Sequence, residues 1–135
     1  MPLRYLLDTN IVSDLVRHPQ GRVASHIATS GEETICTSIV VAAELRYGAQ
    51  KSEAKKLAER IDLPLSAIEV VTLEPPADHR YGEIRHYLTQ QGALIGPNDP
   101  LIAAHALALD LTLVSANARE FSRVAHLRTE NWLLE

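Results

Sequence analysis

The chain has 135 residues, the length of one ordinary domain, and its 46% hydrophobic content predicts a folded core rather than a disordered chain. Seventeen acidic against thirteen basic residues give a net charge of −4, which argues against binding to nucleic acid through overall positive charge. The single cysteine, Cys36, excludes an intrachain disulfide and is expected to be a buried thiol. The sequence shows neither a signal peptide nor an apolar run of about 18 residues, so we expect a cytoplasmic protein that does not span a membrane.

Short apolar runs alternate with helical patterns along the chain. The expected strands lie at residues 3–7, 34–38, 67–73, 112–116 and, as a last short strand, within 125–132. The expected helices lie at residues 10–17, 21–30, 38–50, 52–61, 75–92 and 100–110. Strands that alternate with helices predict an α/β fold with a mostly parallel sheet. No linker divides the chain, so we predict one domain, residues 1–135.

Two aspartates stand at the ends of predicted elements. Asp8 directly follows the first strand, where ligand sites of open α/β sheets lie, although it can equally be a turn residue or a helix cap. Asp99 precedes Pro100 at the start of an apolar helix, and this pair is also a good helix start. Further along that helix, His105 is expected to be a core histidine. Asp110, about 16 Å from Asp99, is expected at the helix end or the surface.

Glu44 is the only charged residue in the stretch TSIVVAAEL. On a helix it shares a face with Val40 and Tyr47, which we expect to point toward the core. A carboxylate on an apolar face must be paired, protonated or bound to a metal ion. The alternative to a metal ion is an ion pair with a nearby arginine, such as Arg46 or Arg4.

Three acids, one in each βα unit, indicate a site for a hard divalent cation. Converging carboxylates raise one another's pKa unless a cation neutralises them, and oxygen ligands suit Mg²⁺ or Mn²⁺. An isolated cysteine and the lack of HxxxH spacing speak against zinc. The chain lacks a P-loop, a GxGxxG motif and a GxSxG motif, so the reaction that remains is metal-assisted phosphodiester cleavage or a related phosphate transfer.

A phosphoacceptor domain of the receiver or haloacid dehalogenase type is an alternative enzyme class. Asn10 speaks against the dehalogenase type, because it occupies the place of the second aspartate that this pattern prefers.

Four blocks in this order resemble the PIN domain and, more narrowly, the VapC-type ribonuclease toxins of bacterial toxin–antitoxin pairs: LLDTNIVSDL, TSIVVAAELRYGA, IGPNDPLIAAHAL and TLVSANAREFSRV. The resemblance runs over nearly the whole chain. It implies an α/β fold, a PIN-like three-layer sandwich with a mostly parallel central sheet flanked by helices. It also implies an endoribonuclease that depends on Mg²⁺ or Mn²⁺.

The resemblance assigns residues to the site. Asp8, Glu44 and Asp99 match the family's catalytic, metal-binding acids. A fourth position, often acidic in the family, falls on Asn117, which can offer an amide oxygen or hold a water but brings no charge. This departure leaves the number of metal ions open. Thr9 or Ser38 is a candidate for orienting an acid or a metal-bound water.

The resemblance also implies partners. A cognate VapB-type antitoxin would dock in a groove and block the acidic site, and the toxin would form a homodimer. The substrates of such toxins are structured RNAs, and the subgroup that this chain resembles includes enzymes that cut the anticodon stem-loop of initiator transfer RNA. Cleavage inhibits translation. The alternative is a degenerate PIN-like binding module that kept the fold and lost the metal, and Asn117 is its best support.

Local positive charge is needed to hold RNA around acidic residues. Residues 46–60 carry five basic and two acidic side chains, Arg46 and Lys51 among the basic ones, and Arg80 and Arg85 belong to a second basic segment. We predict that these four residues contact phosphates at the rim of the site, although a solvated helix face is the alternative. An aromatic content of 4% argues against an extensive base-stacking platform.

Overall fold

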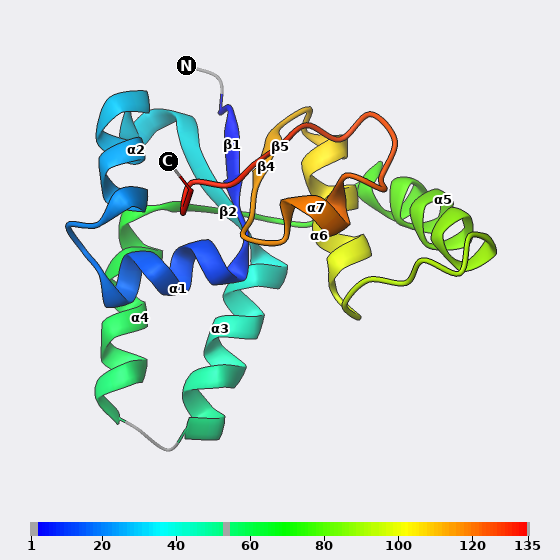
Figure 1. Ribbon diagram of the computed structural model, residues 1–135. Helices are drawn as coiled ribbons and strands as arrows, with labels where there is room; N and C mark the ends of the chain where they lie inside the picture. Colours follow the sequence, from blue (N-terminus) through cyan, green and yellow to red (C-terminus); the bar gives the residue numbers. More distant parts are fainter. Residues whose placement is uncertain (1–2, 53–54, 135) are drawn as a thin grey trace.

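A five-stranded parallel sheet forms the centre of the protein (Figure 1). The computed structural model describes residues 3–52 and 55–134, without the side chains of residues 52 and 55–58. The strands are β1 (Tyr5–Leu7), β2 (Ile35–Ser38), β3 (Glu69–Val71), β4 (Thr112–Val114) and β5 (Thr129–Glu130). They lie in the order β3-β2-β1-β4-β5, and each neighbouring pair is parallel. Because every neighbouring pair is parallel, the carboxyl ends of the strands lie at one edge of the sheet.

Helices flank the sheet on both sides, as the three-layer prediction requires. Figure 1 shows α1, α2 and α4 on one side of the strands and α5, α6 and α7 on the other. The helices are α1 (Thr9–Arg17), α2 (Arg22–Ser30), α3 (Ile39–Ser52), α4 (Lys55–Ala67), α5 (Ala77–Gln90), α6 (Asp99–Ala108) and α7 (Ala118–Phe121), with a 3₁₀ turn at Glu32–Thr34. In the described part of the chain, no helix combines the length and the apolar character needed to cross a membrane.

Burial on both faces of the sheet explains the strand sequences. Leu6 and Leu7 of β1 and Leu113 and Val114 of β4 are all fully buried, as is usual for parallel strands covered by helices on both faces. Helix α6 is apolar nearly all round, with Ile102 and three alanines buried, because it packs against both α5 and β4.

The predicted elements are confirmed, and the differences lie mainly at their ends. The first strand begins at Tyr5 and the third spans only Glu69–Val71, because strand pairing extends no further. Helix α4 continues to Ala67, beyond the predicted end at residue 61, and includes Pro64. Helix α7 and the 3₁₀ turn were not predicted, since single helical turns carry no apolar period.

Two polar residues precede α3, and each has a different role. The hydroxyl of Ser38 accepts a hydrogen bond from the amide of Val40 at 3.0 Å. The hydroxyl of Thr37 instead donates to the carbonyl of Leu7 at 2.6 Å and ties β2 to β1. Ser38 is therefore the cap, and Thr37 serves the sheet.

Candidate active site

Asp8 is held at the carboxyl end of β1, where it caps helix α1. Only 3% of the residue is exposed. Its Oδ1 accepts from the amide of Thr9 at 2.8 Å, and its Oδ2 accepts from the hydroxyl of Ser115 at 2.7 Å. Burial raises the pKa of Asp8, the two hydrogen bonds oppose this, and the charges of Asp99 and Glu44 raise it further. The cap predicted as the alternative to a site residue is therefore real, and it fixes a buried carboxylate where strand ends converge.

Ser115 is a residue that the sequence reasoning missed. It follows β4 as Asp8 follows β1, since Leu7 pairs with Val114 and the amide of Asp8 donates to the carbonyl of Val114 at 2.8 Å. Its fully buried hydroxyl also accepts from the amide of Asn117 at 2.9 Å. A small polar residue directly after an apolar strand was the only available signal.

Asn117 lies two residues beyond Ser115, at the N-cap position of α7, and it is exposed. Its side chain makes no cap hydrogen bond. The asparagine that matches the family's fourth position is thus next to the residue that holds Asp8. Its backbone joins the network at Ser115, and its amide side chain faces solvent.

Glu44 projects from α3 and is half-buried. Its Oε1 accepts from the hydroxyl of Thr9 at 2.5 Å, and its Oε2 accepts from the amide nitrogen of Asn98 at 3.2 Å. The alternative ion pair with Arg46 is not formed, since Arg46 pairs with Asp62 of α4. Helices α1 and α6 therefore hold this carboxylate with neutral donors.

Two expectations about the surroundings of Glu44 need correction. Tyr47 was expected to point toward the core, but 67% of it is exposed, because α3 packs through Leu45 and Ala49 instead. Arg4, the other candidate partner, lies over the ring of Tyr5 at 5.1 Å from its centroid, at the start of β1. Glu44 thus stands at the rim of the core rather than inside it.

Asp99 is the first residue of α6 and is half-buried. It is not the N-cap, which is Asn98, and its Oδ2 accepts from the upstream amide of Gly96 at 3.1 Å. Burial raises the pKa of Asp99, the Gly96 bond opposes this, and the charges of Glu44 and Glu120 raise it further. A Cβ at Gly96 would lie 2.7 Å from Oδ2, so only glycine lets the carboxylate occupy this place.

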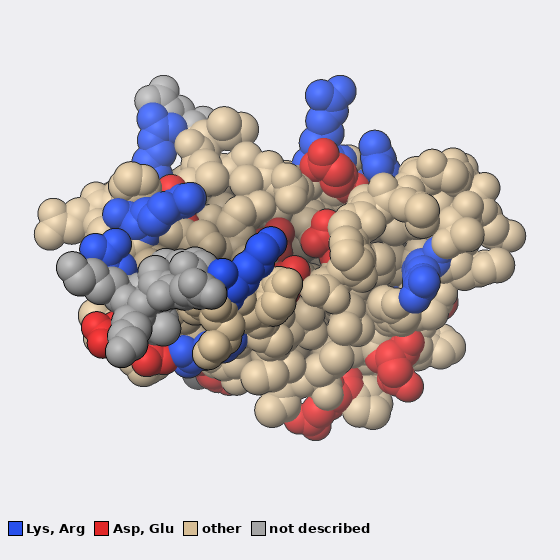
Figure 2. All heavy atoms as spheres, turned by 90° about the horizontal axis from the view of Figure 1, so that it is seen from below, with Lys and Arg blue, Asp and Glu red and all other residues tan. Residues whose placement is uncertain are grey.

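Three carboxylates from separate βα units therefore converge at one end of the sheet. Figure 2 views this end and shows acidic side chains recessed near the middle of the face, with Lys and Arg side chains around them. Among the side chains that the structure describes, no lysine or arginine forms an ion pair with Asp8, Glu44 or Asp99. The described side chains therefore leave these three acids without a basic partner.

The donor set fits a hydrated hard cation. Within residues 3–52 and 55–134, no three histidine, cysteine, aspartate or glutamate side chains lie close enough together to hold a metal ion by themselves. Mg²⁺ keeps several of its waters and is usually bound through one or two carboxylates, so it does not require three collected ligands. The raised pKa values of Asp8 and Asp99 show that each carboxylate is disfavoured as a bare anion.

The predicted RNA contacts on α3 lie close to the acids along the chain. Arg46 follows Glu44 by two residues, and Lys51 lies near the end of the same helix. Both side chains are exposed, and Arg46 is engaged with Asp62. Their contact with RNA stays a prediction.

The predicted contacts on α5 lie further from the acids. Arg80 forms an ion pair with Glu83 at 3.6 Å and lines a hollow with Leu107, which lies eight residues, about 12 Å, beyond Asp99 on α6. Arg85 donates to the hydroxyl of Tyr81 at 2.7 Å. The contact of these two arginines with RNA also stays a prediction.

His105 is the buried core histidine that was predicted. It is 1% exposed, with Nδ1 2.7 Å from the hydroxyl of Ser38 and Nε2 3.1 Å from the carbonyl of Thr72. Of the two candidates for orienting an acid or a metal-bound water, Thr9 contacts an acid, since its hydroxyl donates to Glu44. The hydroxyl of Ser38 contacts His105 and the amide of Val40 instead.

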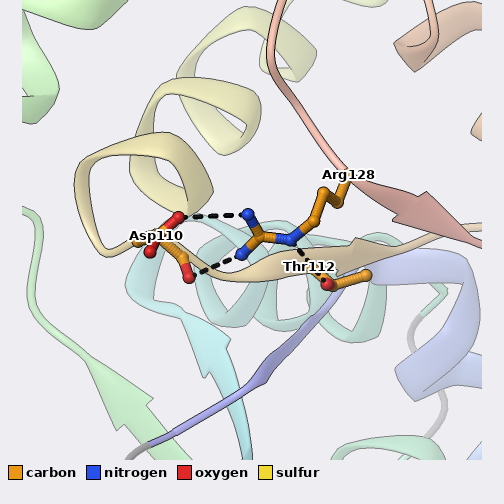
Figure 3. A network of polar contacts seen from close by, with 3 residues as sticks. All are labelled: Asp110, Thr112 and Arg128. Carbon is orange, nitrogen blue, oxygen red and sulfur yellow. Dashed lines mark hydrogen bonds and ion pairs between the residues drawn. The ribbon is translucent and has the colours of Figure 1, made fainter.

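Asp110 and Cys36 also play the structural parts expected of them. Figure 3 shows the guanidinium of Arg128 directed toward Asp110 and Thr112. It donates to the Asp110 carboxylate at 3.2 Å, to the Asp110 carbonyl at 2.9 Å and to the Thr112 hydroxyl at 3.4 Å. These hydrogen bonds hold the left-handed backbone of Asp110 (φ 56°) at the surface after α6.

Cys36 is a buried thiol, as expected. Burial raises the pKa of the Cys36 thiol to about 12, so the thiol is not activated as a nucleophile.

Comparison with known proteins agrees with this geometry. Residues 5–127 match the family model of the PIN domain. The chain belongs to the PIN-domain family. This PIN domain is 41% identical over 130 residues to ribonuclease VapC2 of Rickettsia felis, covering 95% of this chain and 97% of the relative. It is 38% identical over 132 residues to the tRNA(fMet)-specific endonuclease VapC of Shigella flexneri, covering 96% of this chain and 98% of the relative.

A solved structure confirms the fold of this PIN domain. A chain in the crystal structure of VapBC2 from Rickettsia felis, bound to a DNA fragment from their promoter, superposes with a TM-score of 0.89. The two chains are 36% identical, and the match covers 96% of this chain and 99% of the other. The predicted resemblance to VapC-type PIN domains and the predicted three-layer fold are therefore confirmed.

Proposed function

We propose that this chain is a divalent-metal-dependent endoribonuclease toxin that cuts structured RNA and so inhibits translation. The observation that carries the proposal is the convergence of Asp8, Glu44 and Asp99 at one end of the sheet, without basic partners among the described residues. The relatives, named ribonuclease and endonuclease, favour the enzyme over the degenerate binding module.

We infer separate roles for the residues of the site: some would hold the metal ion, and others hold the carboxylates in place. Asp8 and Asp99 would hold a Mg²⁺ or Mn²⁺ ion with Glu44, and Asn117 would hold a water beside them. When bound, such an ion polarises the phosphate and lowers the pKa of a water. Ser115 keeps the Asp8 carboxylate in place, and Thr9 and Asn98 do the same for Glu44.

The substrate and partners are inferred from the relatives. The Shigella flexneri relative is named a tRNA(fMet)-specific endonuclease, so initiator transfer RNA, cut in its anticodon stem-loop, is the first substrate to test. The Rickettsia felis structure is a VapBC2 complex, so we infer a cognate VapB-type antitoxin here. A homodimer and RNA contacts by Arg46, Lys51, Arg80 and Arg85 stay predictions. We infer one domain over residues 1–135, because one sheet takes strands from both ends of the chain.

Cleavage of total bacterial RNA tests the proposal. Wild type, Asp8→Asn and Asp99→Asn are compared with and without Mg²⁺ or Mn²⁺. Asp110→Asn is the matched control, because this carboxylate lies beyond the other end of α6 and asparagine tolerates its positive φ. We expect discrete, metal-dependent fragments from wild type and Asp110→Asn and none from the two site variants.

Two results would contradict the proposal. One is the absence of fragments from a folded, metal-supplied wild type that mass spectrometry shows to be free of antitoxin. That result would favour the binding module. The other is undiminished cleavage by Asp99→Asn, which would make Asp99 a structural residue only.

A further inference from the structure

Asn98 stands at the N-cap position of α6 but does not cap the helix. Asparagine is a preferred N-cap because its side-chain oxygen accepts from amides of the first turn. Here the backbone of Asn98 is near-helical (φ −96°, ψ −8°), and the side chain makes no cap hydrogen bond. The local helix therefore does not account for where this side chain points.

The amide of Asn98 reaches across the site to another helix. It donates to Oε2 of Glu44 at 3.2 Å, a residue 54 positions earlier on α3. Thr9, at the start of α1, donates its hydroxyl to the other oxygen, Oε1, at 2.5 Å. Both oxygens of Glu44 thus accept one neutral donor each, from opposite helices.

Neutral donors have a specific effect on this carboxylate. They restrict its rotation without neutralising its charge, and each oxygen keeps a lone pair for a further partner. An arginine in the same place would occupy both oxygens and cancel the charge. The arrangement orients Glu44 and leaves it able to act on a cation or on a water bound to one.

The position of Asn98 in the chain links Glu44 to a second acid. Asp99 follows directly, and its carboxylate is held by the amide of Gly96 at 3.1 Å. The start of α6 therefore fixes the position of two carboxylates. Asp99 belongs to this turn, and Glu44 is held through the side-chain amide of Asn98. A shift of this turn would move both.

We propose that Asn98 is a positioning residue that orients the Glu44 carboxylate so that Glu44 and Asp99 face a divalent cation together. The inference rests on the proposed metal-dependent function. Residues that hydrogen-bond to metal ligands fix ligand orientation, and their loss typically lowers metal affinity by about 10–100-fold. Asn98 is exposed and supplies a single bond, so we expect the lower end, about tenfold, for Asn98→Ala.

Mn²⁺ binding to the full chain, followed by electron paramagnetic resonance of the free ion, tests this role without any substrate. The variants are Asn98→Ala and the conservative Asn98→Gln, each also combined with Glu44→Gln. Gln90→Ala, which removes an exposed amide from α5, is the control. Thermal unfolding without metal is measured for every variant, because a merely structural residue would lower the unfolding midpoint.

The proposal predicts that Asn98→Ala loses about tenfold in Mn²⁺ affinity and that Asn98→Gln recovers most of it. It further predicts that the unfolding midpoint stays within about 2 °C of wild type, as for other exposed substitutions, and that Asn98→Ala adds no loss in the Glu44→Gln background. Unchanged affinity, an equal loss without Glu44, or a matching loss of stability would overturn it. A wild type that binds no Mn²⁺ would overturn the proposed function and this inference together, whereas binding that ignores Asn98 overturns the inference alone.

Discussion

Removing the hydroxyl of Ser115 should destabilise the protein through Asp8. The hydroxyl is fully buried, donates to the buried Asp8 carboxylate at 2.7 Å and accepts from the amide of Asn117 at 2.9 Å. A hydrogen bond to a charged group contributes about 1.5–3 kcal/mol and a neutral one about 1 kcal/mol. Ser115→Ala should therefore lower the free energy of unfolding by about 3 kcal/mol, and the Tm by about 10 °C in a chain of this size.

Urea unfolding at pH 7.5 without metal measures this cost. Ser66→Ala is the control, since it removes an exposed hydroxyl bonded to the Leu63 carbonyl at 2.8 Å and should change stability by less than about 0.5 kcal/mol. In an Asp8→Asn background, the cost of Ser115→Ala should fall to about 1 kcal/mol, because the charged acceptor is gone. A cost below about 0.5 kcal/mol, or one unchanged by Asp8→Asn, would refute the argument that Ser115 stabilises the ionised carboxylate.

Three further predictions follow from the same geometry. Burial raises the pKa of Asp8, so the folded state holds this proton more tightly than the unfolded state and the ionised carboxylate destabilises the fold at higher pH. Asp8→Asn, which retains the cap, should therefore raise the free energy of unfolding at pH 7.5 without metal while abolishing cleavage. A less stable variant would contradict this. Gly96→Ala should displace the Asp99 carboxylate, because the new Cβ would lie 2.7 Å from its Oδ2, and should lower Mn²⁺ affinity about tenfold as measured by calorimetry. Gly82→Ala is the control, since its Cβ would meet nothing within 4 Å and the affinity should stay unchanged. Burial lowers the pKa of His105, so the folded state binds fewer protons than the unfolded state. The stability that His105 contributes is present above about pH 6.5 and is lost as the pH falls toward the lowered pKa. His105→Gln should therefore flatten the pH dependence of stability below about pH 6.5 in urea titrations, and a slope equal to that of wild type would count against this.

The alternation of strands and helices, and with it the parallel sheet, could be predicted from the sequence. Apolar runs and helical periods are local signals, and they located every strand to within a few residues. The acids Asp8 and Asp99 were also predictable as candidates, because each lies where a strand ends or a helix begins, and parallel strands bring such positions to one edge.

Contacts between distant residues lay beyond the sequence. The period of a helix tells which residues share a face but not what that face meets, so Tyr47 was expected in the core and is exposed. The partner that Glu44 needed was sought among arginines close to it or in the first strand, whereas its donors come from 35 and 54 positions away.

The elements, their order and the three acids that could form a site can all be found from the amino-acid sequence, because strand and helix periods and caps depend on near neighbours. How those acids are held depends instead on contacts between distant parts of the chain. Ser115 meets Asp8 across 107 residues and Asn98 meets Glu44 across 54. Such pairs exist only once β4 lies beside β1 and α6 lies beside α3. The packing of layers, rather than any local pattern, therefore sets the orientation of each carboxylate.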